Sequence, residues 1–171
     1  MKKLILVKTD ESHLGELQAM KQEFELSGDE LHGAAMLHNY DDMSKWLEDV
    51  RNYENKETLP NPSHVPATQW LLMHEGESRI LATINLRHEL NDFLREEGGH
   101  IGYSTRPSER RKGYATAMLK LCLEECRKMG INPVMVSCDD DNIASRKTIE
   151  ACGGVFERMS KNGKTMLFWI G

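Results

Sequence analysis

Residues 98–117 read GGHIGYSTRPSERRKGYATA, and this stretch decides the fold. Its first part, GGHIGYST, is an extended run that predicts a strand. The segment after it carries apolar residues at alternating intervals of four and three, which is the spacing of one helix face. We therefore predict a strand, a tight basic turn and a helix, whose apolar face is formed by Ala115, Leu119, Cys122, Cys126 and Met129.

The basic turn, RPSERRKG at residues 106–113, is suited to binding an anion. A turn that opens a helix presents unpaired backbone N–H groups at the positive end of the helix dipole, and Gly113 lets another molecule approach the main chain. Arg110, Arg111 and Lys112 stand where the dipole disfavours cations, which indicates an anionic ligand, most simply a pyrophosphate. The alternative is a solvated helix start with no ligand. The sequence has neither the GxxxxGK(S/T) loop nor the three-glycine dinucleotide fingerprint here.

The turn resembles the acetyl-CoA motif of the GCN5-related N-acetyltransferase (GNAT) superfamily, Q/R-x-x-G-x-G/A after a strand and a proline. Arg110, Gly113 and Ala115 occupy its fixed positions, and Pro107 lies three residues upstream. The resemblance covers residues 70–170 and implies an α/β fold with a mixed, mostly antiparallel central sheet flanked by helices. It also implies acetyl-CoA as co-substrate. The longer stretch from residue 86 to residue 115 is similar to an uncharacterised bacterial branch of predicted acetyltransferases, whose acceptor is unknown.

A second element, VMVSCDDDNIASRKTIEACGGVF at residues 134–156, reads as a strand, an acidic turn and a helix that begins at Asn142. In the family this strand splays away from the strand before the basic turn, and the pantetheine arm lies in the gap. By resemblance, Asn142 and Ser145 hydrogen-bond that arm; alternatively, Asn142 only caps its helix and Ser145 faces solvent. The cofactor-binding residues expected in all are Tyr103, Ser104, Thr105, Arg110, Arg111, Lys112, Gly113, Tyr114, Ala115, Asn142 and Ser145.

This helix departs from a common family pattern. Many relatives carry a tyrosine seven residues after the asparagine, and its phenol is taken to protonate the leaving thiolate. Here Ile149 stands at that position, so no phenol comes from this helix. A thiol has a pKa near ~8.5, so its thiolate is a tolerable leaving group close to neutrality, and solvent or another group protonates it.

Acetyl transfer to an amine also needs a base and a polarised carbonyl. The amine must lose a proton before it attacks, and Glu97 and His100 are the catalytic candidates for accepting it. The competing interpretation of residues 95–100 is a solvated, charged hairpin tip. Backbone N–H groups of residues 103–105 would polarise the carbonyl if the sheet parts beside them.

The stretch INLRHELNDFL, residues 84–94, allows two interpretations. Its polar residues cluster at the end of a predicted strand, where acceptor sites lie in the family, so they are candidate substrate-binding residues. Alternatively, the stretch forms a short polar-faced helix with Leu90, Phe93 and Leu94 packed inside. The candidate substrate-binding residues are Arg87, His88, Glu89 and Asn91.

The remainder of the chain predicts a single α/β domain over residues 1–171. We expect a strand at 3–7, a helix capped by Thr9 or Asp10, a second helix at 42–53, and a hairpin of strands 68–74 and 79–87. Residues 27–40 and 55–67 read as irregular connections.

Composition excludes several classes of protein. The net charge of −5 and the interspersed acids argue against nucleic-acid binding. No apolar run reaches membrane-spanning length and the N-terminal apolar run is too short for a signal peptide, so we expect a cytoplasmic protein without membrane partners. Cys122 and Cys126 lie one helical turn apart on an apolar face, which favours core packing over a metal site.

These features together predict an acetyl-CoA-dependent N-acetyltransferase that acts on a primary amine. Direct attack in a ternary complex is preferred over an acyl-enzyme, because Cys138 has no identifiable base partner. The alternative is a non-catalytic acyl-CoA-binding or sensing domain. We also predict that the last strand, residues 165–170, can form a homodimer.

Overall fold

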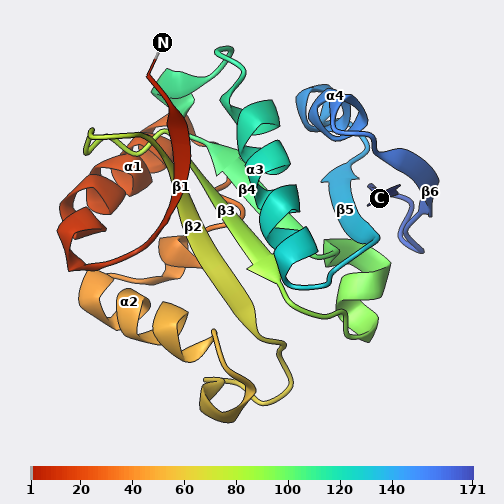
Figure 1. Ribbon diagram of the computed structural model, residues 1–171, viewed down its shortest axis with the longest axis horizontal. Helices are drawn as coiled ribbons and strands as arrows, with labels where there is room; N and C mark the ends of the chain where they lie inside the picture. Colours follow the sequence, from red (N-terminus) through yellow and green to blue (C-terminus); the bar gives the residue numbers. More distant parts are fainter. Residues whose placement is uncertain (1) are drawn as a thin grey trace.

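A computed structural model describes residues 2–171 and has one seven-stranded sheet in the order β1-β2-β3-β4-β5-β7-β6 (Figure 1). Every neighbouring pair is antiparallel except β4–β5, which is parallel. The predicted mixed, mostly antiparallel sheet is therefore confirmed. The strands are β1 (Leu4–Lys8), β2 (Ala67–His74), β3 (Ala82–Arg87), β4 (Ile101–Thr105), β5 (Val134–Asp139), β6 (Val155–Met159) and β7 (Thr165–Ile170).

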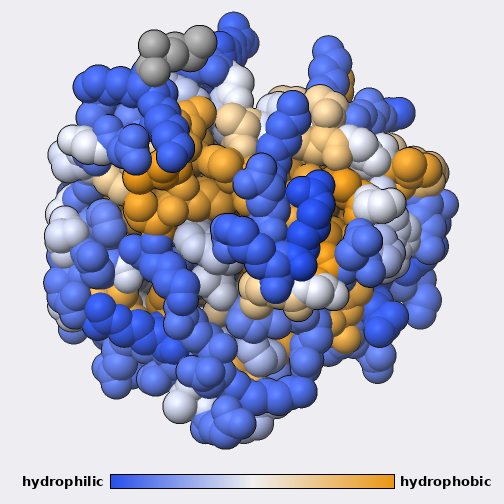
Figure 2. Space-filling model, in the orientation of Figure 1, coloured by the Kyte–Doolittle hydropathy of each residue, from blue (hydrophilic) through white to orange (hydrophobic). Residues whose placement is uncertain are grey.

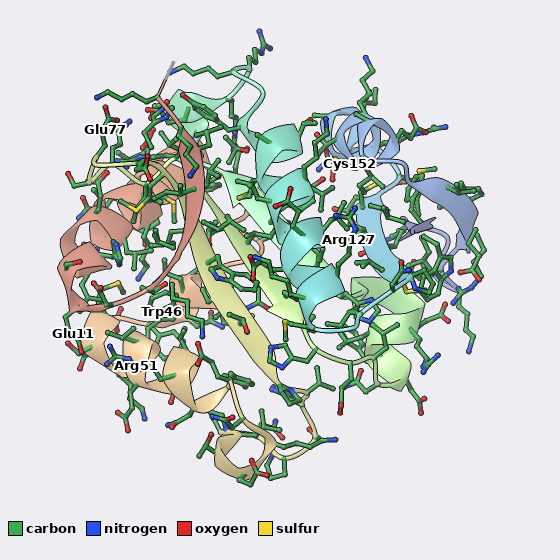
Figure 3. The ribbon with its side chains drawn as sticks, viewed as in Figure 1. Glu11, Trp46, Arg51, Glu77, Arg127 and Cys152 are labelled. Carbon is green, nitrogen blue, oxygen red and sulfur yellow. The ribbon has the colours of Figure 1, made fainter. Side chains whose placement is uncertain are left out.

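The first two α-helices begin where the sequence predicts them. The Asp10 carboxylate accepts a hydrogen bond from the Ser12 amide at 2.8 Å and caps a single 3₁₀ turn that leads into α1 (Leu14–Ser27). In the same way, Asp42 caps α2 (Met43–Asn52) through the Ser44 amide at 2.9 Å. Figure 3 shows Trp46 on the side of α2 that faces the rest of the molecule, and its indole N–H donates to the Ala34 carbonyl at 3.0 Å.

Two helical layers cover the two faces of the sheet. Leu71 and Met73 of β2 pack against α1 and α2, whereas Trp70 and Leu72 point to the opposite face. That second face is covered by α3 (Tyr114–Lys128) and α4 (Ile143–Ala151). Figure 2 shows that apolar surface remains beside α3 on the viewed side, bounded by hydrophilic side chains. Because both faces of β2 are covered, the strand is buried almost throughout its length.

Helix α3 uses the apolar face predicted from its spacing. Leu119, Cys122 and Cys126 are completely buried, which confirms that the two cysteines pack in the core. All four cysteines of the chain are free thiols. Met129 differs, because it follows the last helical residue and is 42% exposed.

The sheet opens between β4 and β5. Their pairing has a single registered position, Ile101 opposite Val136. Just before it, the His100 amide donates to the Met135 carbonyl at 2.7 Å, and the His100 Nδ1 accepts from the Met135 amide at 2.9 Å. Among residues 2–171, no registered pair joins the two strands beyond Ile101, so they diverge toward their carboxyl ends. Helices α3 and α4 begin at this same end of the sheet (Figure 1).

Strand β7 lies inside the sheet, between β5 and β6. Both of its edges are therefore occupied, so residues 165–170 have no free edge for strand pairing with a second copy, and the homodimer stays a prediction. Among residues 2–171, none of the helices combines the length and apolar composition that a membrane span requires.

Candidate active site

A cavity of about 610 Å³ extends from the gap between β4 and β5 into the layer of loops before α2. At the gap it is lined by Tyr103 of β4, Cys138 of β5, and Asn142 and Ser145 at the start of α4. Its volume is within the usual range for small-molecule sites. The gap and the cavity therefore form one continuous space.

The basic turn lies beside the gap and has unoccupied hydrogen-bond donors. Gly113 is the N-cap of α3, with φ at +79° and no side-chain cap. Arg111 also has a positive φ, +63°, a conformation found in the anion-binding nests that successive backbone N–H groups form. Among residues 2–171, the amides of residues 111–116 have no protein acceptor. A Cβ placed on Gly113 would meet nothing within 4 Å, so the approach to these amides is open.

The charges on the turn are more compensated than the sequence suggested. Arg110 pairs with Asp29 at 2.6 Å and stacks over the ring of Phe24. Lys112 pairs at 2.9 Å with the buried Glu109. Burial raises the pKa of the Glu109 carboxyl, but its hydrogen bonds to cations outweigh burial and the net shift is downward. Arg111 is exposed and, among residues 2–171, no carboxylate pairs with it, so its side chain and the backbone amides are the groups most open to an anion, with Arg110 at their side.

The register of β4 decides which of its amides reach the gap. The Arg106 amide donates to Leu81 on the β3 side. Because donors alternate between the edges of an antiparallel strand, the amides of Tyr103 and Thr105 point toward the gap, whereas that of Ser104 points toward β3. The Ser104 hydroxyl accepts instead from the His32 amide at 2.8 Å. The Ser104 hydroxyl therefore holds the loop that contains His32, and the Ser104 amide does not face the gap.

At the start of α4, Asn142 caps the helix through the Ser145 amide at 3.0 Å, as one of the two interpretations predicted. The Ser145 hydroxyl lies 2.6 Å from the hydroxyl of Tyr103. Burial raises the pKa of Tyr103 to about 12, so the phenol is protonated at neutral pH. Ile149, which stands where many relatives carry a tyrosine, is completely buried in the core. A phenol nevertheless lies in the gap, and it comes from β4.

The two base candidates are placed differently. Glu97 lines the cavity, and its carboxylate accepts from the Asn162 side chain at 3.0 Å. His100 is 7% exposed and does not line the cavity. Burial, and then the nearby charges of Arg87 and Arg95, lowers the pKa of His100 to about 4. Glu97 therefore lies in the site, whereas His100 is hydrogen-bonded where β4 and β5 are still paired.

The four substrate-binding candidates divide in the same way. Arg87 and Asn91 line the cavity, whereas His88 and Glu89 do not. His88 contacts the Thr68 hydroxyl at 2.8 Å, and Glu89 pairs with Lys56 at 3.1 Å.

The competing prediction of a short helix in this stretch is only partly right. A π-helical turn covers Leu94–Gly98, and Asn91 accepts from the Leu94 amide at 2.9 Å. Leu94 is buried, but Phe93 is 65% exposed and lines the cavity, so it does not pack inside.

Sequence reasoning missed most of the cavity wall. Its aromatic and polar side chains come from predicted irregular connections, from ordinary strand positions and, for Tyr53, from the end of the predicted helix 42–53. Their sole local signal is Gly33, where a Cβ would meet the Gly102 carbonyl oxygen at 2.2 Å, so the loop lies directly on β4. The missed lining residues include His38, Tyr40, Tyr53, His64, Gln69 and Asn85.

The comparisons with known proteins agree with this geometry. A family model described as an acetyltransferase (GNAT) domain matches residues 3–155. The chain belongs to the GNAT acetyltransferase family. One curated relative, the uncharacterized N-acetyltransferase YjdG of Bacillus subtilis (strain 168), is 32% identical over 69 residues, which are 40% of this chain and 41% of that protein. The chain therefore spans about two fifths of the length of this relative.

Solved GNAT structures are similar over almost the whole chain. The ribosomal L7/L12 α-N-protein acetyltransferase RimL in complex with coenzyme A is 15% identical, with a TM-score of 0.69 over 99% of this chain and 93% of that chain. The microcin C7 self immunity acetyltransferase MccE, in complex with acetyl-CoA and AMP, is 15% identical with a TM-score of 0.67 over 98% and 91%. An acetyltransferase of Salmonella typhimurium that modifies the N-terminal serine of L7/L12 is 15% identical with a TM-score of 0.64 over 99% and 94%. At this identity the likeness shows the fold, and it confirms the predicted fold class.

The GNAT family uses acetyl-CoA as co-substrate, and the residues of this chain fit that group. The uncapped amides of residues 111–116 offer donors for a diphosphate. The gap between β4 and β5 leaves backbone groups available for an extended polar arm. The open space at Gly113 admits the ligand without displacing a side chain.

Proposed function

We propose that this GNAT protein transfers the acetyl group of acetyl-CoA to a primary amine by direct attack in a ternary complex. The observation that carries the proposal is the continuity of the site. The uncapped turn follows β4 at the carboxyl ends of β4 and β5, where the gap opens, and the cavity runs from this gap along β4 toward its amino end, where Glu97 lies. A coenzyme held in the first two would present its acyl end to the third.

When bound, acetyl-CoA supplies the acetyl thioester. The amides of residues 111–116 hold the diphosphate, aided by the side chain of Arg110. The amides of Tyr103 and Thr105 point into the gap, where they stabilise negative charge on an acyl oxygen. Asn142 and Ser145 line the same space and are positioned to contact the polar arm.

Glu97 is the proposed base. A primary ammonium has a pKa near ~10, so the amine must lose a proton to become a nucleophile. Glu97 lines the cavity and accepts from Asn162, which fixes one carboxylate oxygen and leaves the second for a substrate proton or a bridging water. His100 is a positioning residue in this proposal, because its ring accepts from Met135 where the sheet is still closed.

The Tyr103 hydroxyl is the proposed acid for the leaving thiolate. It lies in the gap, it is protonated at neutral pH, and it shares a hydrogen bond with Ser145. It would supply from β4 the phenol that α4 lacks at Ile149. The direct mechanism is supported by Cys138, since burial raises the pKa of its thiol to about 11 and keeps it a poor nucleophile.

A pair of glycine variants tests the coenzyme site. Gly113 and Gly76 both have φ at +79° and open space where an added methyl group would lie, so Gly113→Ala and Gly76→Ala should cost the fold the same. Only Gly113 lies against the proposed diphosphate. We expect Gly113→Ala to weaken CoA binding in calorimetry by about tenfold or more, and Gly76→Ala to leave it unchanged.

Thiol release with a panel of primary amines completes the test. Turnover with at least one amine, reduced in Gly113→Ala, supports the acetyltransferase. Binding of CoA without turnover on any amine would instead support the acyl-CoA-binding domain, and the absence of CoA binding would refute both.

A further inference from the structure

Arg87 is a cation at the floor of the cavity. It is the last residue of β3, and its side chain lies on the sheet face that also carries Asn85 and Gly102. A Cβ on Gly102 would lie 3.4 Å from the Arg87 Nη2, and one on Gly98 would lie 3.7 Å from its Nη1. The absence of side chains at these two glycines leaves the guanidinium room beneath the cavity.

Only one side of this guanidinium is occupied. Its Nη1 donates to the carbonyl oxygens of Gly98 at 3.1 Å and Gly99 at 3.3 Å. Among residues 2–171, neither Nε nor Nη2 has a protein acceptor, and no carboxylate lies within 4 Å of the group. Burial lowers the pKa of Arg87, yet an arginine stays charged in proteins. The cavity therefore holds a positive charge without a negative partner.

Arg106 shows how this chain satisfies an arginine that serves the fold. Arg106 is buried, and it pairs with both Glu16, at 2.6 Å, and Glu23, while donating to the Ile80 carbonyl at 3.2 Å. Breaking such a pair is costly because it leaves an uncompensated charge. Arg87 is half-buried at the wall of the cavity and has no equivalent carboxylates. A purely structural role accounts for its Nη1 contacts and leaves its other edge unexplained.

The unoccupied edge has a definite chemical preference. The Nε–H and Nη2–H of a guanidinium point in parallel and form a planar fork that matches the two oxygens of a carboxylate. The surrounding wall contributes Tyr40, Tyr53 and Phe93, which suit an apolar or aromatic body. Glu97 lies on the same cavity and is the proposed partner of the amine.

We infer that the acceptor is a small amine that carries a carboxylate, and that Arg87 binds this carboxylate through Nε and Nη2. This inference rests on the proposed function. It names the acceptor class as an amino acid with an apolar body. Arg87 thereby orients the acceptor from the side of the cavity opposite to the coenzyme.

The test compares two probes of equal shape, phenylacetate and phenylacetamide, binding to the protein saturated with CoA. We expect calorimetry to show the carboxylate binding about tenfold or more tightly than the amide. Arg87→Gln should abolish this preference. Arg87→Lys, which keeps the charge and loses the fork, should retain only part of it. Arg95→Gln is the charge-matched control, because Arg95 is exposed near the cavity without lining it, and it should keep the full preference.

The outcomes separate this inference from the proposed function. Equal binding of the two probes to wild type, or binding of neither, overturns the carboxylate assignment even if CoA binds and amines are acetylated. The wild-type comparison needs no variant, so it stands even if Arg87→Gln fails to fold. In turnover, phenylalanine should exceed phenethylamine in kcat/KM by a similar factor, and the reverse order would count against the inference. Loss of CoA binding, in contrast, refutes the proposed function itself.

Discussion

The turn proposed to hold the diphosphate comes from one continuous segment, whereas the acceptor cavity is assembled from segments that are far apart in the sequence. The basic turn follows β4 directly and runs into α3. Gly113 has open space around it, but Gly33 in the cavity wall is pressed against the backbone of β4. The first region depends on local conformation, and the second depends on tertiary packing. Substitutions should therefore affect ligand binding at the turn and stability at the cavity wall.

The largest effect is expected at Gly33. A methyl group there would meet the Gly102 carbonyl oxygen at 2.2 Å and the Tyr103 amide nitrogen at 2.4 Å, both of them backbone atoms that cannot rotate away. Gly33→Ala should lower the free energy of unfolding by more than about 4 kcal/mol in urea denaturation. Gly28→Ala is the control, because Gly28 has a similar φ of +74° and open surroundings, and it should cost about 1 kcal/mol. Equal losses would mean that the loop does not rest on β4.

The same contrast explains what the sequence could and could not predict. The strand, turn and helix of residues 98–128 were predicted correctly because apolar spacing and turn residues are local signals. The capping of the 3₁₀ turn before α1 by Asp10 and of α2 by Asp42 belongs to the same class. The interior position of β7 was missed, since strand order in a sheet leaves no mark on the spacing within a strand.

The acceptor cavity was predicted only in part, for a related reason. Arg87 and Asn91 were found because they cluster near one strand end, and Glu97 was found as a candidate base just before β4. Tyr40 lies in the loop that Gly33 brings onto the sheet, where the Gln69 side chain donates to the Gly33 carbonyl at 2.9 Å, and Tyr53 reaches the cavity from the end of α2. Such contacts join positions with no shared periodicity, so local patterns do not reveal them.

The next effect lies at the junction of the two regions, where His100 joins β4 to β5. Its folded pKa of about 4 lies below the ordinary 6.5, so the unfolded chain binds the extra proton in this range. The contribution of neutral His100 is therefore complete above pH 6.5 and is lost as the pH falls toward 4, by about 3 kcal/mol in all. Urea denaturation across this range should show the slope in wild type.

The His100→Asn variant isolates that contribution. Its amide oxygen can replace Nδ1 as the acceptor for the Met135 amide, and it does not titrate. The slope between pH 6.5 and pH 4 should therefore become shallower in the variant. If both proteins lose stability in parallel, His100 is not the group that titrates.

A smaller effect, on turnover alone, is expected at the Tyr103 hydroxyl. Tyr103→Phe should lower the rate of thiol release by about 100-fold, which is typical for loss of a general acid, while CoA binding stays within about threefold. Tyr114→Phe is the matched control, since its hydroxyl contacts His74 and does not line the cavity. A Tyr103→Phe enzyme with the turnover of wild type would assign the thiolate proton to solvent. A loss confined to CoA affinity would assign Tyr103 to binding.

The smallest effect concerns the exposed pair of Arg110 and Asp29 at the turn. Their 2.6 Å contact ties up the guanidinium that would otherwise assist the diphosphate, and the hydrogen bond from Arg110 lowers the pKa of Asp29. Arg110→Gln should weaken CoA binding by about fivefold, and Asp29→Asn should strengthen it by about twofold because the arginine is released. Both changes should fade in high salt, since the side chains are exposed to solvent. Calorimetry of both variants at low and high salt makes this measurement. If Arg110 serves the ligand, the two substitutions should change the CoA affinity in opposite directions. If Arg110 only holds the end of α1 to the turn, both substitutions should change the CoA affinity in the same direction.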